Sequence, residues 1–147
     1  MSLNDKLQPA AAASLDRWHA MVASGDLRAL GQLLHPDAVF RSPMAHKPYA
    51  SAQAVALILK TVAGVFSNFK YHRQLASDDG LSVVLEFSAN VADKALKGID
   101  LIQFDADGRI VDFEVMVRPL SGLQALGAEM GRHLGAILPA YQSAQAK

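Results

Sequence analysis

The chain has 147 residues, of which 51% are hydrophobic and 19% are charged, and its formal net charge is zero. This length and composition are typical of one folded domain with a substantial core, and they argue against a disordered chain. The zero net charge gives no electrostatic reason to expect a nucleic acid as partner. Because the sequence has no cysteine, it excludes disulfides, thiolate catalysis and thiolate-bound zinc.

The sequence carries no sign of a membrane or of a cofactor. The N-terminal residues are polar and lack the apolar run of a secretion signal, and no stretch approaches the roughly eighteen apolar residues of a membrane span. It also lacks a phosphate-binding loop, a dinucleotide fingerprint and a nucleophile elbow. Glu129 and His133 lie four residues apart, but this spacing is far more often a solvated pair than a metal site. We therefore expect a cytoplasmic protein without cofactor or metal.

The first half of the chain is mainly helical in pattern. Apolar residues recur at helical spacing over about 9–24, and Gly25 suits the end of that helix. Asp26 is expected to cap a second, shorter helix that stops at Pro36. A short strand over 38–41 and a proline-containing loop follow. Ser51 is expected to cap a third helix, which continues to Phe66.

The second half alternates in the manner of strands. Two strands are expected over about 69–76 and 81–90, and residues 91–97 read as a polar turn. A hairpin follows over 98–118, with its turn at Asp107-Gly108. A last helix over about 120–138 contains three interior glycines, Gly127, Gly131 and Gly135, whose spacing of four puts them on one stripe. Either another element approaches this stripe closely, or the glycines only weaken the helix.

The hairpin over 98–118 holds the most informative residue. Alternation puts Asp100, Ile102 and Phe104 on one face of its first strand. If Ile102 and Phe104 join the core, Asp100 is a carboxyl group that points inward. On the strand expected over 69–76, Tyr71 and Arg73 are expected to share one face and His72 to take the other, and the sequence leaves open which face is inward.

The order of these elements predicts the fold class. Helices that precede antiparallel strands indicate an α+β protein. We expect a single domain over residues 1–147, with a core over about 9–118 and the C-terminal helix over about 120–138. A curved, mainly antiparallel sheet packed on helices would form a cone with an internal pocket.

Several local patterns together resemble the SnoaL-like, or nuclear transport factor 2-like, α+β cone. They are the helix that ends at Gly25-Asp26-Leu27, the entry into the first strand over 34–40, and the segment from Ile99 to Ile110. The resemblance covers about residues 12–118. It implies a homodimer formed through the outer sheet face and an apolar pocket inside the cone, and the fold hosts enzymes, ligand binders and structural dimers.

Within this superfamily the chain is similar to ketosteroid isomerase. Asp100 matches the carboxylic acid that donates a hydrogen bond to the substrate oxyanion in the isomerase. Trp18 stands where the isomerase has a tyrosine, and Ser42 stands where it has its general base. Trp18 can still donate through its indole N–H, whereas Ser42 cannot act as a base unaided. The sequence thus argues against steroid isomerisation by the isomerase mechanism.

Asp100 and His46 are the predicted catalytic residues. A carboxyl group in an apolar cone has a raised pKa and can donate or transfer a proton. His46 lies in the loop after the first strand, and an imidazole is the natural replacement for the base missing at Ser42. The residues predicted to line the ligand pocket are Trp18, Ser42, Met44, Tyr49, Phe87, Ile102, Phe113, Val115 and Val117.

Two functions stay open at this point. The first is a cofactor-free isomerase, cyclase or hydratase that acts on a small apolar carbonyl compound, as in the SnoaL-type cyclases, where one acidic residue serves as acid and base. The second is a non-catalytic dimer that binds an apolar ligand or a protein partner. Glu86, Glu114 and Arg118 fall on the outward face of the strands, where cross-strand ion pairs at a dimer surface are the ordinary explanation.

Overall fold

The computed structural model describes residues 2–142. Its helices are α1 (Leu3–Lys6), α2 (Pro9–Ser24), α3 (Ala52–Val65) and α4 (Leu120–Leu134), with two short 3-10 helices, η1 (Leu30–Leu33) and η2 (Leu138–Tyr141). Its strands are β1 (Leu34–Arg41), β2 (Tyr49–Ala50), β3 (Ser67–Ala76), β4 (Ser82–Val91), β5 (Lys94–Phe104) and β6 (Ile110–Arg118).

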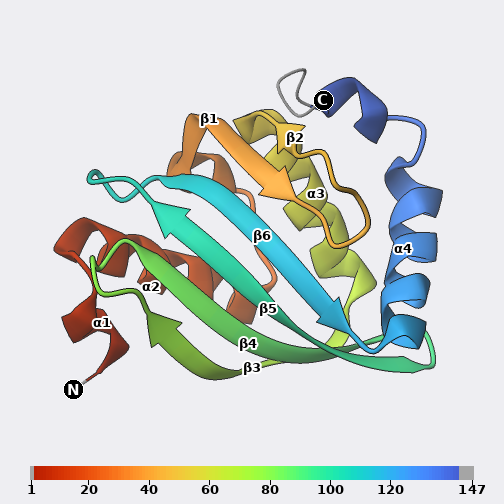
Figure 1. Ribbon diagram of the computed structural model, residues 1–147, viewed down its shortest axis with the longest axis horizontal. Coiled ribbons are helices and arrows are strands. Elements are labelled where there is room, and N and C mark those ends of the chain that lie inside the picture. Colours follow the sequence, from red (N-terminus) through yellow and green to blue (C-terminus); the bar gives the residue numbers. More distant parts are fainter. Residues whose placement is uncertain (1, 143–147) are drawn as a thin grey trace.

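The strands form one curved sheet in the order β2-β1-β6-β5-β4-β3. Every neighbouring pair is antiparallel except β1 and β6, which run parallel. Figure 1 shows α2 and α3 on one side of this sheet and α4 beside the end of β6. The predicted α+β fold with a curved, mainly antiparallel sheet is therefore confirmed. No helix of the described residues is long and apolar enough to cross a membrane.

Three predicted elements differ from the structure. The strand before the loop starts at Leu34, because Pro36 lies inside β1 at a break in its pairing with β6, between Leu34 and Val39. A proline has no N–H to donate, so it fits where the ladder is interrupted. The helix expected after Asp26 is only the short η1, and the predicted polar turn over 91–97 shrinks to two residues between Val91 and Lys94, which pair directly.

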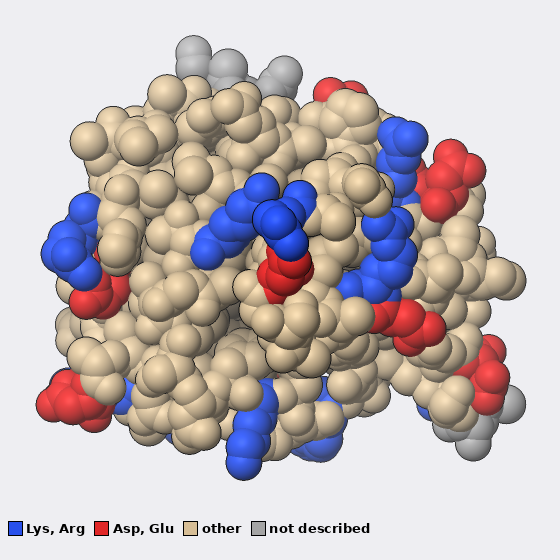
Figure 2. Space-filling view, turned by 180° about the vertical axis from the view of Figure 1, so that it is seen from behind, with Lys and Arg blue, Asp and Glu red and all other residues tan. Residues whose placement is uncertain are grey.

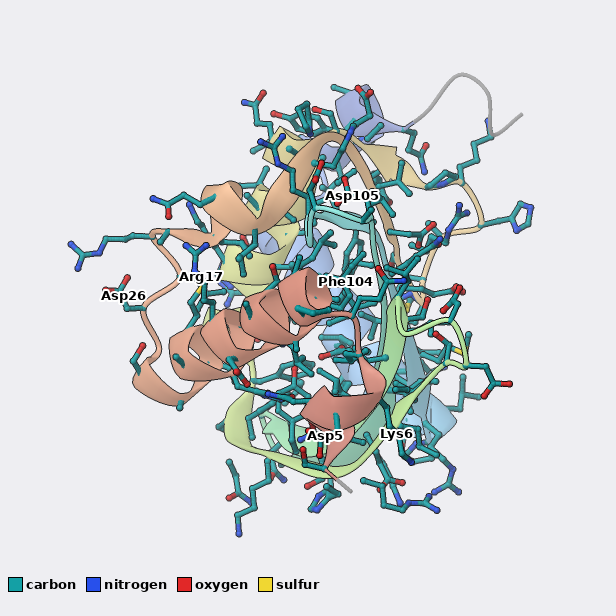
Figure 3. The ribbon with its side chains drawn as sticks, turned by 90° about the vertical axis from the view of Figure 1, so that its left-hand side faces the viewer. Asp5, Lys6, Arg17, Asp26, Phe104 and Asp105 are labelled. Atoms are coloured by element: carbon teal, nitrogen blue, oxygen red, sulfur yellow. The ribbon has the colours of Figure 1, made fainter. Side chains whose placement is uncertain are left out.

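The predicted inward face of the hairpin is confirmed. Asp100 is only 6% exposed, and Ile102 and Phe104 are buried with it. The turn lies where Asp107-Gly108 predicts it, with Gly108 at a φ of 82°. Figure 3 shows the molecule from the α2 side, with Phe104 in the interior and Asp105 at the turn that follows β5.

A bulge in β3 decides the question that Tyr71, His72 and Arg73 left open. Tyr71 pairs with Phe87 and Gln74 pairs with Leu85, so β3 advances by three residues where β4 advances by two. The extra residue breaks the alternation. Tyr71 therefore faces the concave side, whereas Arg73 faces the outer side and pairs with Glu86. The expectation that Tyr71 and Arg73 share a face is wrong because of this bulge.

Candidate functional site

A cavity of about 1240 Å³ lies between the concave face of the sheet and helices α2, α3 and α4. Aromatic and aliphatic side chains make most of its lining, and such a lining is typical of sites for small organic molecules. Figure 2 shows the helical side of the molecule, where most of the surface is neither acidic nor basic. Among the lining residues are Phe40, Ile58, Leu59, Val62, Phe66, Phe69, Phe113, Val115, Leu126 and Met130.

A chain of hydrogen bonds crosses the concave side of the sheet. Trp18 on α2 donates from Nε1 to the hydroxyl of Tyr71 on β3 over 3.0 Å. That hydroxyl donates to Oδ2 of Asp100 on β5 over 2.6 Å. The tyrosine hydroxyl therefore accepts one hydrogen bond and uses its only proton to donate the other to Asp100. The carboxyl group of Asp100 is the last acceptor of this chain of hydrogen bonds.

The second carboxyl oxygen of Asp100 faces the cavity. Asp100 belongs to the cavity lining, and its only side-chain hydrogen bond to the described residues is the one that Oδ2 accepts. Every fully enclosed side-chain nitrogen or oxygen of the described residues has a partner. Oδ1 of Asp100 has no partner among these residues, so it must reach open space. It is thus free to bond a molecule in the cavity.

Burial controls the protonation of this site. Removal from water raises the pKa of Asp100 from 3.8 to about 7, and the hydrogen bond from Tyr71 opposes the rise. The same burial, together with the nearby Asp100 charge, raises the pKa of Tyr71 well above its usual 10. Tyr71 therefore remains a neutral phenol at any working pH, whereas Asp100 exchanges a proton near neutral pH. When Asp100 is protonated, its proton sits on Oδ1, because Oδ2 already accepts from Tyr71.

Most of the predicted site residues meet at this cavity. The structure brings Asp100 together with the predicted lining residues Trp18, Ser42, Met44, Tyr49, Phe113 and Val115. Ser42 accepts a hydrogen bond from the backbone N–H of Met44 over 3.0 Å. No base lies within hydrogen-bonding distance of the Ser42 hydroxyl among the described residues.

Four predicted site residues lie elsewhere. His46 is exposed on the loop before β2 and does not contribute to the cavity lining, so it is not placed to act on a molecule there. Phe87 is fully buried behind the lining, against Phe66 and Phe69. Ile102 is fully buried in the core, and Val117 packs near the end of β6 in a smaller cluster with Leu126. Facing inward on the sheet is thus not enough to reach the cavity.

Sequence reasoning left the direction of one cavity residue open and missed another. Tyr71 was considered, but the bulge in β3 that turns it inward has no sequence signal. His19 follows Trp18 on α2 and also lines the cavity, with its ring edge-to-face against Tyr71 at a centroid distance of 5.2 Å. Helical periodicity singled out Trp18 as apolar and passed over its polar neighbour.

Gly127 and Gly131 of α4, and Gly135 directly after its last residue, form part of the cavity wall. All three line it, and a Cβ at Gly127 would collide with Cε of Met44. A Cβ at Gly131 would meet no atom of residues 2–142 within 4 Å. The predicted close approach is thus present at Gly127, against the predicted pocket residue Met44, whereas Gly131 leaves room. Among residues 2–142, no three histidine, aspartate or glutamate side chains gather as metal ligands would.

Comparisons with known proteins agree with this architecture. A crystal structure of a steroid delta-isomerase from Pseudomonas aeruginosa is 68% identical, with a TM-score of 0.87 over 90% of this chain and 97% of that chain. A conserved bacterial protein with a cystatin-like fold from Silicibacter pomeroyi is 33% identical, with a TM-score of 0.78 over 87% of this chain and 91% of that one.

A more distant structure and a family profile complete the comparison. A nuclear transport factor 2-like protein from Mesorhizobium loti is 19% identical, with a TM-score of 0.67 over 76% of this chain and 93% of that one, a likeness of fold alone. The search of curated proteins found no match. The profile of the SnoaL-like domain matches residues 15–113, about two thirds of the chain. The chain therefore belongs to the SnoaL-like family.

Proposed function

We propose that the cavity binds a small apolar carbonyl compound and that Asp100 donates a hydrogen bond or a proton to its oxygen. One observation carries this proposal. A buried carboxyl group presents a free oxygen to an apolar cavity while its other oxygen is held by Tyr71. A protonated acid in such surroundings stabilises negative charge on a bound oxygen, because there is little water to compete for the bond.

The chemistry that suits this group is a proton shift next to a carbonyl. When a C–H bond beside a carbonyl loses its proton, charge develops on the carbonyl oxygen, and a donor aimed at that oxygen lowers the barrier. The 68% identical structure is named a steroid delta-isomerase, which is an enzyme that moves a carbon–carbon double bond. We therefore favour isomerisation of a β,γ-unsaturated ketone over cyclisation or hydration.

Asp100→Asn tests this function. The amide keeps the shape of the side chain and can still accept the bond from Tyr71, but it cannot lose or transfer a proton. We expect turnover of a β,γ-unsaturated ketone, followed by the ultraviolet absorbance of the conjugated product, to fall at least about 100-fold. The affinity for the conjugated product, measured by fluorescence of Trp18, is expected to change only a few-fold. Unchanged turnover in the variant would refute a role for Asp100.

A non-catalytic binding module is the second candidate. The observation that favours it is Ser42, a neutral residue that lines the cavity where the isomerase pattern has its base. In that case the protein binds the ketone, the affinity survives Asp100→Asn, and neither form changes the absorbance of the substrate. The same two assays therefore separate the two candidates.

We also propose that two copies pair through the outer face of the sheet. Glu86 on β4 is only 7% exposed there, between Arg73 at 2.7 Å and Lys97 at 3.0 Å, and Met116, which lies two strands away on β6, is 45% exposed. An apolar side chain beside a paired charge cluster suits a dimer surface. Light scattering is expected to give twice the chain mass, and Met116→Asp is expected to give the chain mass while the fold persists. A monomeric unmodified protein would contradict this assembly.

A further inference from the structure

His19 stands beside the hydrogen-bond chain that ends at Asp100. It lies on α2, next to Trp18, and its ring packs edge-to-face against Tyr71 at 5.2 Å. The side chain is half-buried and lines the cavity. Of the five histidines of the sequence, all of which are described, His19 alone contributes to the cavity wall. This position makes it a candidate for the proton-accepting role that Ser42 cannot fill.

The hydrogen bond of His19 fixes which ring nitrogen carries the proton. Nε2 lies 3.0 Å from the side-chain oxygen of Gln74. An amide oxygen only accepts, so Nε2 must donate, and in the neutral ring the lone pair then lies on Nδ1. Nδ1 makes no hydrogen bond to the described residues. The neutral imidazole therefore keeps a free basic nitrogen.

The bulge in β3 creates this arrangement. Tyr71 and Gln74 are three residues apart, so a regular strand would place them on opposite faces. The extra residue between them puts both on the concave side, where Tyr71 bonds Asp100 and Gln74 bonds His19. The same local irregularity thus orients the carboxyl group and the imidazole.

Other titratable groups around the cavity do not duplicate this role. Asp26 is paired with Arg28 over 2.8 Å, and Lys60 is an exposed cation. The hydroxyl of Tyr71 donates its hydrogen bond to Asp100, and Tyr49 is a phenol on the short strand β2. Asp16 lies on the same helix as His19 and accepts from the Asn4 amide. The charged and titratable residues that share the cavity lining with His19 are Asp26, Arg28, Tyr49, Lys60, Tyr71 and Asp100.

We propose that His19 is the proton acceptor for the isomerisation, an inference that rests on the proposed function. Nδ1 takes the proton from the carbon beside the ketone, and the electron pair of that C–H bond moves into the enolate. The Oδ1–H of Asp100 holds the enolate oxygen. The protonated imidazole then returns its proton to the far carbon of the former double bond, which gives the conjugated ketone. The proton and the electron pair stay within the substrate and His19, so no oxidant or reductant is needed.

His19→Gln tests the inference, with His72→Gln as its matched control. His72 bonds Ser88 over 2.7 Å on the other face of β3 and lies outside the cavity lining. We expect His19→Gln to lower kcat at least about 100-fold with KM within a few-fold, and His72→Gln to leave both unchanged.

A second variant keeps the test independent of the glutamine side chain. His19→Ala is expected to lose turnover and to regain part of it when imidazole is added to the buffer, which a purely structural histidine would not allow. If His19→Gln keeps the kcat of the parent while Asp100→Asn loses turnover, the inference is overturned and the proposed function stands. If the parent itself turns over no β,γ-unsaturated ketone, both are overturned.

Discussion

Asp100→Asn is expected to stabilise the protein at alkaline pH, by about 4 kcal/mol at pH 9. The carboxyl group of Asp100 has a pKa of about 7 in the folded chain against 3.8 as its ordinary value. Between these two values the folded state binds a proton that the unfolded state has released. The free energy of unfolding therefore falls as the pH rises through this interval, and the loss is complete above the folded pKa.

The asparagine removes this loss because its amide does not ionise. Below about pH 4 both forms of the protein hold a neutral side chain at this position, so their free energies of unfolding should converge. Urea unfolding at a series of pH values between 4 and 9 measures the difference directly. If the difference in free energy of unfolding between Asp100→Asn and the parent is the same at every pH, the pKa of Asp100 is not raised.

Glu86→Gln is the control, because it is expected to change the free energy of unfolding in the opposite direction to Asp100→Asn. Hydrogen bonds from Arg73 and Lys97 hold the pKa of Glu86 well below its usual range. The carboxylate therefore stabilises the folded state above the ordinary pKa of 4.5, and this stabilisation disappears as the pH falls through the lowered pKa. We expect Glu86→Gln to be less stable than the parent at neutral and alkaline pH, which is the reverse of the effect of Asp100→Asn.

The pKa values of Glu86 and Asp100 shift in opposite directions because the two side chains lie on opposite faces of the sheet. Both lie on central strands and both are nearly inaccessible. Glu86 is on the outer face, where long cationic side chains of β3 and β5 reach it. Asp100 faces the cone, where its only side-chain partner among the described residues is the neutral hydroxyl of Tyr71. The sequence predicted this difference, because strict alternation along β4 and β5 separates the two faces.

Alternation also explains what the sequence could not predict. It is reliable along β5, where Asp100, Ile102 and Phe104 face inward as expected, because the pairing with β4 is unbroken from Val91 to Ser82. It fails along β3, because a bulge inserts one extra residue into the strand and no sequence pattern marks its position. Tyr71 and Gln74 depend on that bulge, so the partners of Asp100 and His19 could not be derived beforehand.

The sequence also could not predict which inward-facing residues reach the cavity and which are buried behind its lining. Phe87, Ile102 and Val115 all belong to inward faces, yet only Val115 lines the cavity. Which of them reaches open space depends on how the helices and neighbouring rings fill the cone, and Phe66 and Phe69 cover Phe87. The loop over 42–49 has no periodicity, so the expected position of His46 rested on its proximity in sequence alone.

Tyr71→Phe is expected to shift the alkaline limb of turnover to higher pH. The hydroxyl of Tyr71 lowers the pKa of Asp100 by bonding its ionised form, so its removal leaves burial unopposed and the pKa rises above about 7. Asp100 then stays protonated, and able to donate to a carbonyl oxygen, over a wider range of pH. The shift appears as a displacement of the high-pH fall in kcat/KM, and carbon-13 titration of labelled aspartate reports the same pKa without any substrate.

The same substitution separates the effect on pKa from the effect on stability. Trp18 Nε1 loses the acceptor that it bonds over 3.0 Å, and an unpaired buried donor costs about 1 to 3 kcal/mol of stability at every pH. Tyr49→Phe is the control, because Tyr49 also lines the cavity but makes no hydrogen bond to Asp100. It should move neither the alkaline limb nor the carbon-13 titration. An unchanged Asp100 pKa in Tyr71→Phe would mean that the tyrosine hydroxyl does not act on the carboxylate, and the role of the Trp18–Tyr71–Asp100 chain would reduce to packing.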